Sequence, residues 1–283
     1  MEFTNPQRAE VLIEALPYIQ KYNDKIVVVK YGGGAMKNDD LKHKVMGDIV
    51  LLSLIGVKVV LVHGGGPEIT ETLGKLGMES KFLNGLRVTD ADTAKIVQMV
   101  LAGKTNKDLV SILQSVGGKA IGLCGIDGGM ISATMKDENL GYVGEITDFD
   151  PTPVLNTLES GYIPVIATLG CDNDGNVYNI NADTAAAKIA ATLGAESLIS
   201  LTDTSGILRD PSDKTSTIPV INVDEAYKLV DEGIISGGMI PKVDCCVNAV
   251  REGVKKVFII DGSIPHSLIV EMLTDEGIGT MFH

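Results

Sequence analysis

The sequence predicts an α/β protein built around a mainly parallel β-sheet. Short runs rich in Val and Ile alternate with stretches whose apolar residues recur at helical spacing, which is the pattern of βαβ units. The chain has 283 residues, of which 45% are hydrophobic, so it is long enough to bury a substantial core. These observations are compatible with a folded globular enzyme.

Ahead of the first strand, the apolar residues keep helical spacing, and we expect an amphipathic helix bent at Pro17. The residues that define this spacing are Val11, Leu12, Ala15, Leu16 and Ile19. The first βαβ unit follows, with strands predicted at 26–29 and 57–62 and a helix at 41–55 between them.

The same alternation continues through the rest of the chain. Later strands are predicted at 120–124, 162–167, 197–201 and 256–260, and helices at 182–193, 223–231 and 243–251. The polar turn at 172–175 interrupts this rhythm, and we place a boundary between two lobes near it.

Composition argues against several classes of protein. A formal net charge of −13 opposes binding to nucleic acid or to an anionic membrane, so any phosphate site must be local. Residues 1–10 lack the apolar core of a secretion signal, and no apolar run approaches the ~18 residues of a membrane span. We therefore expect a cytoplasmic protein. The four cysteines lack CxxC spacing, which favours reduced, mostly buried thiols over a zinc site or disulfides.

Two glycine-rich loops follow predicted strands, KYGGG at 30–34 and HGGGP at 63–67. Consecutive glycines let backbone N–H groups surround an anion, and the lysine adds positive charge, which suits a polyphosphate. Neither loop matches the GxGxxG fingerprint or a P-loop. The structural alternatives are a tight turn beside a solvent-exposed Lys30, and a packed or capping role for His63.

Four further polar segments stand at 84–90 (NGLRVTD), 179–187 (NINADTAAA), 201–206 (LTDTSG) and 237–242 (GGMIPK). The planar fork of Arg87 matches a carboxylate, although a surface ion pair is the commoner fate of an arginine. Asp183 opens an alanine-rich helix, either as an ordinary cap or as a carboxylate that holds two lysines or a magnesium ion near phosphate. Each of these segments is weak evidence alone.

Taken in this order, the six segments resemble the motifs of the acetylglutamate kinases, a branch of the amino acid kinase family. The resemblance implies a three-layer αβα sandwich with two lobes, residues 26–176 binding the acceptor and residues 177–283 binding ATP. It also implies transfer of the terminal phosphoryl group of ATP to the γ-carboxylate of N-acetyl-L-glutamate, giving N-acetyl-L-glutamyl 5-phosphate in arginine biosynthesis. An ionised carboxylate needs no protein base for this attack, only alignment and charge stabilisation.

Carried over by position, the resemblance implies that Lys30 and Lys242 contact the transferring phosphoryl group and that Asp183 orients both lysines. The residues implied to bind the acceptor are Gly65, Gly66, Arg87 and Asn179. The residues implied to bind ATP are Gly32, Gly33, Thr202, Asp203, Gly206, Ile207, Ile235, Ser236 and Met239. Mg²⁺ is implied to be held by ATP phosphates and water, without a cage of protein ligands.

The segment 1–25 resembles the N-terminal extension of arginine-inhibited members of this branch. The resemblance implies feedback inhibition by L-arginine and assembly into a hexamer, a trimer of dimers, through this oligomerisation helix. The residues implied to form the effector site are Tyr18, His266, Glu271 and Gly277. Whether a PII-type signalling protein is a partner stays open, and no nucleic acid or membrane partner is expected.

Three alternatives follow from the same residues. Another amino acid kinase would act on carbamate, aspartate or the γ-carboxylate of free glutamate, and segments 84–90 and 179–183 argue against it. A binding module that senses acetylglutamate, arginine or nucleotide would not need both Lys30 and Lys242. A dinucleotide-dependent oxidoreductase lacks its glycine fingerprint.

Overall fold

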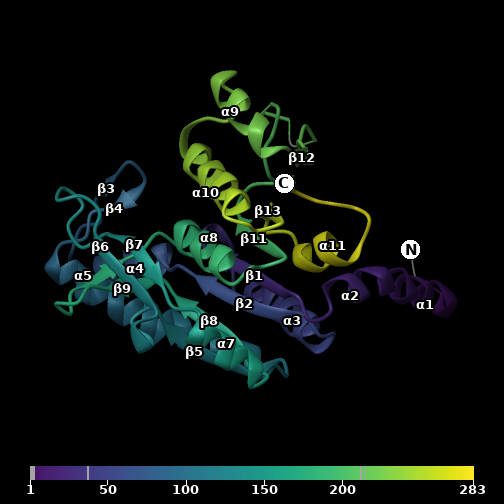
Figure 1. Cartoon of the computed structure of the whole chain (residues 1–283), viewed down its shortest axis with the longest axis horizontal. Helices are drawn as coiled ribbons and strands as arrows, with labels where there is room; N and C mark the ends of the chain where they lie inside the picture. Colours follow the sequence, from purple (N-terminus) through teal and green to yellow (C-terminus); the bar gives the residue numbers. More distant parts are fainter. Residues whose placement is uncertain (1–3, 37, 211, 214) are drawn as a thin grey trace.

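The computed structural model describes residues 4–36, 38–210, 212–213 and 215–283. Within these residues, eight strands form one sheet in the order β12-β14-β13-β11-β1-β2-β8-β5 (Figure 1). The strand bounds are β1 Ile26–Tyr31, β2 Lys58–His63, β5 Ala120–Cys124, β8 Ile163–Ala167, β11 Ser197–Thr202, β12 Val220–Ile221, β13 Lys256–Asp261 and β14 Thr280–Phe282. Every pair in this sheet is parallel except β13 with β14, which confirms the predicted mainly parallel sheet.

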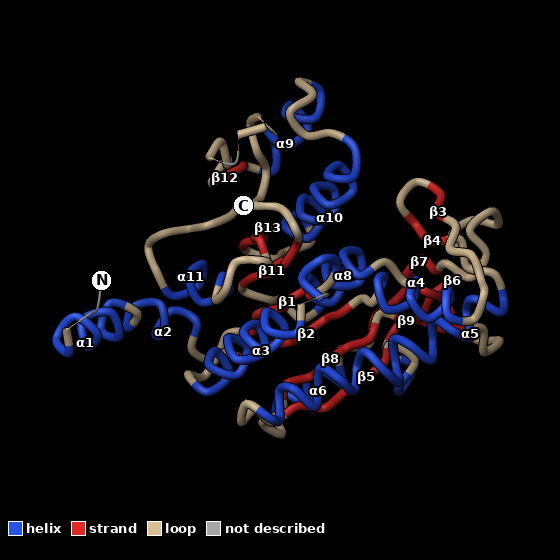
Figure 2. Tube along the Cα trace, turned by 180° about the vertical axis from the view of Figure 1, so that it is seen from behind, coloured by secondary structure: helices blue, strands red, loops and turns tan. Residues whose placement is uncertain are grey.

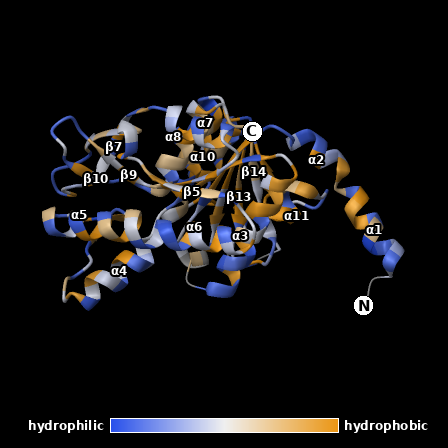
Figure 3. Ribbon diagram, turned by 90° about the horizontal axis from the view of Figure 1, so that it is seen from below, coloured by the Kyte–Doolittle hydropathy of each residue, from blue (hydrophilic) through white to orange (hydrophobic). Residues whose placement is uncertain are grey.

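Helices cover both faces of the sheet because its central strands are apolar on both sides. Along β1, Val28 faces one core cluster, whereas Val27 and Val29 face the other. The first face is covered by α7 (Thr152–Glu159), α8 (Ala182–Thr192) and α10 (Ile240–Arg251), with α9 (Val223–Asp231) packed on α10. The second face is covered by α3 (Asp39–Leu54), α6 (Asn106–Ser115) and α11 (Ser267–Leu273). Figure 3 shows the resulting three layers, with strands between the two sets of helices.

A smaller group of elements lies beyond the carboxyl ends of β2 and β8 (Figure 1). It contains the sheet β10-β9-β6-β7 and the hairpin β3-β4. Its strands are β3 Phe82–Leu83, β4 Leu86–Arg87, β6 Ile131–Met135, β7 Gly144–Phe149, β9 Leu169–Cys171 and β10 Val177–Asn179. Its helices are α4 Gly66–Lys75, α5 Ala91–Gln98 and the π-helix η2 Met99–Thr105, and the short 3₁₀ turns of the chain are η1 Gly33–Met36, η3 Asp127–Gly129 and η4 Gly237–Met239.

The turn predicted at 172–175 joins β9 to β10, which pair in antiparallel fashion. Strands on both sides of the expected lobe boundary therefore share one small sheet. The division at 176 stays a prediction.

The N-terminal segment forms two helices, α1 (Asn5–Glu14) and α2 (Leu16–Tyr22), which meet at Ala15 just before Pro17. The predicted single helix is therefore interrupted two residues before Pro17. Figures 1 and 2 show α1 projecting away from the rest of the molecule. None of its residues is buried, and Val11, Leu12 and Ile13 are all exposed.

None of the helices in the described residues combines the length and the apolar character needed to cross a membrane. The four cysteines carry free thiols, of which Cys124 and Cys246 are buried and Cys171 and Cys245 are partly buried.

Candidate active site

The two glycine loops lie side by side at the carboxyl edge of the sheet. Strands β1 and β2 pair in parallel, with Lys30 opposite Val62 and Tyr31 opposite His63. The Gly64 N–H donates to the Tyr31 carbonyl at 3.2 Å, which holds the second loop against the first. Helix α4 starts immediately afterwards, so its free N-terminal N–H groups add to the positive end of this edge.

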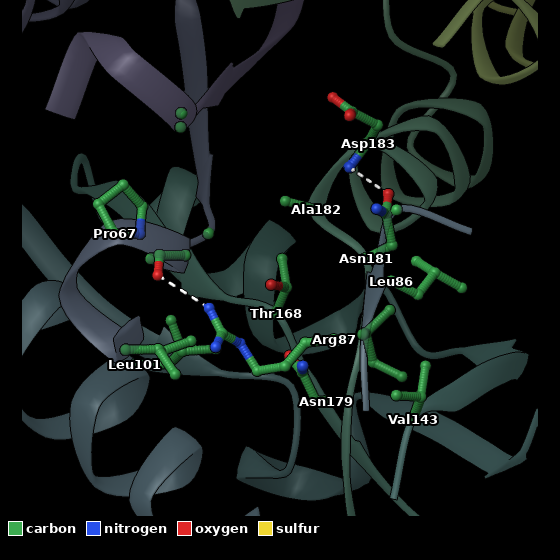
Figure 4. A pocket seen from close by; sticks show the side chains of 18 of the residues that line it. Pro67, Leu86, Arg87, Leu101, Val143, Thr168, Asn179, Asn181, Ala182 and Asp183 are labelled. Atoms are coloured by element: carbon green, nitrogen blue, oxygen red, sulfur yellow. Dashed lines mark hydrogen bonds between the residues drawn. The ribbon is translucent and has the colours of Figure 1, made fainter. Parts of the chain in front are cut away.

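Both loops line a cavity of about 330 Å³. Eight of the residues implied by the resemblance surround it, namely Lys30, Gly32, Gly33, Gly65, Gly66, Arg87, Asn179 and Asp183. Apolar side chains from the neighbouring elements complete the wall, among them Leu86, Leu101 and Val143 (Figure 4). The cavity therefore combines an apolar lining with a few converging charged and amide groups, which is typical of a small-molecule site.

At one side of this cavity, a carboxylate lies between two ammonium groups. Asp183 Oδ1 is 2.8 Å from Lys30 Nζ, and Asp183 Oδ2 is 3.2 Å from Lys242 Nζ. Burial raises the pKa of Asp183, but the two ammonium groups together outweigh burial and bring the pKa below its usual range. Asp183 is thus ionised at neutral pH and keeps two like charges close together.

Local structure explains where Asp183 stands. Asn181 caps α8 by accepting hydrogen bonds from the Asp183 and Thr184 N–H groups at 3.0 and 3.1 Å. The cap role weighed for Asp183 therefore belongs to Asn181. This leaves the Asp183 carboxylate available to the lysines.

Across the cavity, Arg87 is a buried cation, with 6% of its surface exposed. Its guanidinium donates to the Gly66 carbonyl at 3.0 Å, to Thr70 Oγ1 at 2.8 Å and to Ser80 Oγ at 2.7 Å. Figure 4 shows it reaching the glycine loop that precedes Pro67. Among the ion pairs of the described residues, none includes Arg87, so the site has a buried cation with no carboxylate of its own.

The residues implied to bind ATP lie elsewhere. Thr202 ends β11, one strand from the Lys30 loop, and Gly206 has a positive φ of 102°. The side chains of Ile207 and Ile235 are buried in the core, Ser236 precedes η4 and Met239 ends it. Together with Asp203, they are absent from the lining of the described cavity, so their role stays a prediction.

The residues that the resemblance implies for the effector site lie close together around α11. Glu271 Oε2 accepts the Ile278 N–H at 2.9 Å, and a Cβ on Gly277 would lie 3.5 Å from Glu271 Oε1. His266 begins α11, while Tyr18 belongs to α2, which packs on α11. Asp48 belongs to no motif, yet its buried carboxylate lies against this group, with Oδ1 2.6 Å from His266 Nδ1.

We next asked whether side chains of the candidate site could hold Mg²⁺. Within the described part of the chain, no cluster of three or more His, Cys, Asp or Glu side chains is placed to hold a metal ion. Asp183, the carboxylate nearest the cavity's cations, is already shared by two lysines. That Mg²⁺ is held by ATP phosphates and water stays a prediction.

The parallel αβα sandwich, the two glycine loops and the carboxylate-bridged lysines define a phosphoryl-transferring enzyme of small molecules that lacks a P-loop. The sequence matches the profile of the amino acid kinase family over residues 25–261. The chain belongs to this family. It is 58% identical over 283 residues to the acetylglutamate kinase of Brachyspira hyodysenteriae, covering 99% of this chain and 98% of that protein.

Solved structures agree on the fold. The N-acetylglutamate synthase of Neisseria gonorrhoeae, complexed with coenzyme A and N-acetyl-glutamate, has a TM-score of 0.85 at 27% identity. The same enzyme complexed with coenzyme A and L-arginine has a TM-score of 0.81 at 25% identity. Both comparisons cover 97% of this chain, which spans only 63% and 65% of the synthase chains.

Proposed function

We propose that this enzyme transfers the terminal phosphoryl group of ATP to the γ-carboxylate of N-acetyl-L-glutamate, as a step of arginine biosynthesis in the cytoplasm. The observation that carries this proposal is Arg87, a buried guanidinium without a carboxylate partner, in the cavity that also contains Lys30 and Asp183. An acceptor with two carboxylates can pair one of them with Arg87 and place the other beside the lysines. The relative at 58% identity, named an acetylglutamate kinase, supports the same acceptor.

In the proposed reaction, a γ-carboxylate oxygen of the acceptor forms a bond to the γ-phosphorus of ATP. The bond between that phosphorus and the oxygen bridging to the β-phosphate breaks, and ADP leaves. The carboxylate is already ionised, so no protein group has to remove a proton. Arg87 pairs with the α-carboxylate, Asn179 contacts the acceptor, and the γ-carboxylate is left free at the lysine side of the cavity.

The lysines stabilise charge as the phosphoryl group moves. Lys30 and Lys242 neutralise the oxygens of the transferring group, and Asp183 sets the distance between the two ammonium groups. Backbone N–H groups of the loops at Gly32, Gly33, Gly65 and Gly66 add fixed dipoles at the same edge. Mg²⁺ bound together with ATP would supply further positive charge to the phosphates.

The nucleotide is proposed to lie along the carboxyl edge next to β11. The loop after Thr202, with Asp203, Gly206 and Ile207, would form one wall. The segment with Ile235, Ser236 and Met239 would form the other. Because the two isoleucine side chains are buried in the core, we assign these positions backbone contacts with ATP.

Initial rates with close analogues of the acceptor test this function. N-acetyl-L-glutamate should release ADP, whereas N-acetyl-L-glutamine, which lacks the γ-carboxylate, should bind and compete without reacting. Free glutamate should react poorly, because its ammonium group meets the apolar part of the cavity. Equal turnover with carbamate or aspartate would reassign the acceptor.

We further propose that L-arginine inhibits the enzyme at a site formed by Tyr18, His266, Glu271 and Gly277. The support is their grouping around α11, where burial raises the pKa of Glu271 although its carboxylate accepts a backbone hydrogen bond. A guanidinium ligand would stabilise the ionised carboxylate. The exposed apolar residues of α1 support a homohexamer in which these helices pair between dimers. Nothing in the described surface identifies a PII-type partner, and that suggestion rests on the family alone.

A further inference from the structure

Beneath the second glycine loop lies a buried asparagine that the reaction described above does not use. The Nδ2 of Asn106, a side chain 1% exposed, lies 3.1 Å from His63 Nε2 and 2.8 and 3.2 Å from the Val165 and Leu123 carbonyl oxygens, so its two N–H groups serve three acceptors, one hydrogen being shared. One amide therefore ties together the ends of β2, β8 and β5, directly under the cavity floor.

The hydrogen bond from Asn106 fixes the tautomer of His63. Because His63 Nε2 accepts from the amide, its proton is on Nδ1, which donates to the Gly64 carbonyl at 2.8 Å. The Gly64 N–H is held in turn by Tyr31. The peptide groups on both sides of Gly64 are thus fixed by hydrogen bonds. Among the described hydrogen bonds, none takes the N–H groups of Gly65 and Gly66, which line the cavity.

The π-helix η2 explains how residues 101–106 can contact the second glycine loop both beside the cavity and from beneath. Leu101, within η2, lies so close to Gly65 that a Cβ there would be 2.6 Å from Leu101 Cδ2. Asn106 follows five residues later. In an α-helix, residues five apart point about 140° away from each other, whereas the i→i+5 pattern of a π-helix brings them toward one face. The wide turn therefore presents Leu101 and Asn106 to the same loop.

The neighbouring strand is built around the same amide. A Cβ on Gly122 of β5 would lie 1.9 Å from Asn106 Oδ1, so only glycine leaves room for it. Asn106 Oδ1 also accepts from Lys107 Nζ at 3.0 Å, so both ends of the amide are engaged.

We propose that Asn106 is a positioning residue for phosphoryl transfer, acting through His63 and the Gly64 carbonyl to aim the Gly65 and Gly66 N–H groups into the acceptor cavity. This inference rests on the proposed function, because it assigns those N–H groups to the acceptor and its developing charge. A loop misplaced by about 1 Å costs roughly 10²-fold in rate.

Two variants and one control test the role. Asn106→Leu removes the donor at similar volume, and kcat/KM for N-acetylglutamate should fall roughly 10²-fold, through a higher KM for the acceptor and a lower kcat, with the KM for ATP unchanged. Gln114→Leu is the matched control, since it removes an exposed amide from the same helix, α6, and its kinetics should match wild type.

Asn106→Asp replaces the amide donor by a carboxylate acceptor, so the ring proton of neutral His63 must move from Nδ1 to Nε2. Nδ1 can then donate to the Gly64 carbonyl only when the ring carries both protons, as a cation. The charged group facing His63 is Lys107. Relative to wild type, the kcat/KM of this variant should therefore rise as pH is lowered from about 8.5 to 6. Nitrogen NMR of the histidines should show a single Nδ1–H tautomer in the wild-type enzyme and its loss in Asn106→Leu.

The outcomes separate the two proposals. Wild-type enzyme inactive on N-acetylglutamate would overturn the proposed function and this role together. Active wild type with unchanged KM, kcat and tautomer in both variants would overturn the positioning role alone. The same conclusion would follow if the loss of activity matched only a loss of folded protein, measured by the melting transition.

Discussion

Asp183 is the residue through which the charges of the candidate site are arranged. Without it, the ammonium groups of Lys30 and Lys242 would repel each other in a partly desolvated site, because opposite charge is what holds them at 2.8 and 3.2 Å from its two oxygens. The pair must remain cationic to meet a phosphoryl group. A single carboxylate thus serves two lysines from different elements, one on β1 and one on α10.

Replacing Lys242 by alanine should reduce kcat roughly 10²–10³-fold while the protein stays folded. The side chain is 28% exposed and lies outside the core clusters, so its loss removes charge without opening a cavity. Lys188→Ala is the control, because Lys188 on α8 makes only a surface contact with Glu252 at 3.7 Å. Turnover of Lys242→Ala near that of Lys188→Ala would rule out the role.

An Arg87→Lys variant should raise the KM for N-acetylglutamate roughly 10- to 100-fold and leave the KM for ATP unchanged. Lysine keeps the charge but loses the fork that reaches Gly66, Thr70 and Ser80 while facing a carboxylate. Steady-state kinetics with each substrate varied in turn separate the two effects. An equal rise in both KM values would place Arg87 outside the acceptor site.

His63 predicts a pH dependence of stability. Burial lowers the pKa of His63 to about 4 in the folded protein. Between pH 6.5 and 4, the histidine is therefore protonated in the unfolded chain but neutral in the folded protein. The free energy of unfolding should therefore be greatest above pH 6.5 and fall by up to about 3 kcal/mol as pH drops toward 4. Asp48, which is buried, and Glu271, which is partly buried, have pKa values raised by loss of solvent and act in the opposite direction.

Urea unfolding of wild type and His63→Gln between pH 7.5 and 4.5 isolates this contribution. The variant should lose less stability on acidification than wild type. Parallel curves for the two proteins would mean that His63 titrates normally in the folded state.

At the level of elements, the long parallel strands and the helices α3, α8, α9 and α10 were predictable from the sequence, whereas α6, α7 and α11 were not predicted. Strands β1, β2, β5, β8, β11 and β13 start and end within two residues of the predicted positions, because burial on both faces demands continuous β-branched runs. The two- and three-residue strands β3, β4, β9, β10, β12 and β14 were not predicted, since so few residues carry no periodicity. The longer strands β6 and β7 of the small sheet were not predicted either. The π-helix η2 was not predicted either, because no sequence pattern used here distinguishes a π-helix from an α-helix.

Deleting residues 1–14 should leave kcat and melting temperature unchanged, because α1 has no buried residue. The same deletion should reduce a hexamer to dimers and weaken inhibition by arginine. Light scattering coupled to gel filtration measures the mass of the assembly. Leu12 is 74% exposed, and Leu12→Glu should have a similar effect without shortening the chain. An unchanged mass in both proteins would separate α1 from assembly.

At the scale of the whole molecule, charge is distributed unevenly. The chain carries a formal net charge of −13, yet Lys30, Lys242 and Arg87 converge on one edge of the sheet. The sequence predicted that any phosphate site must be local, and it predicted the cationic residues through a resemblance to a family. It could not predict their distances, because Lys30 and Lys242 meet only through strand order and the docking of α8 and α10.

The residues that support the site were beyond prediction for a related reason. Thr70, Ser80 and Asn106 belong to no recognised motif, and their roles arise from partners far away in the sequence. Asn106 bonds Val165, on another strand, only because α6 crosses the end of β8. Supporting polar groups of this kind are defined by tertiary contacts and not by the local sequence.

Trapping of the product with hydroxylamine distinguishes a phosphorylated acceptor from one that is only bound, since an acyl phosphate is converted to a hydroxamate and a free carboxylate is not. With ATP and Mg²⁺, N-acetyl-L-glutamate should yield a hydroxamate in amounts equal to the ADP released, and glutamate, aspartate and carbamate should yield little or none. Bound ATP without hydroxamate from any of these acceptors would contradict the account and favour a protein that senses its ligands instead of phosphorylating one.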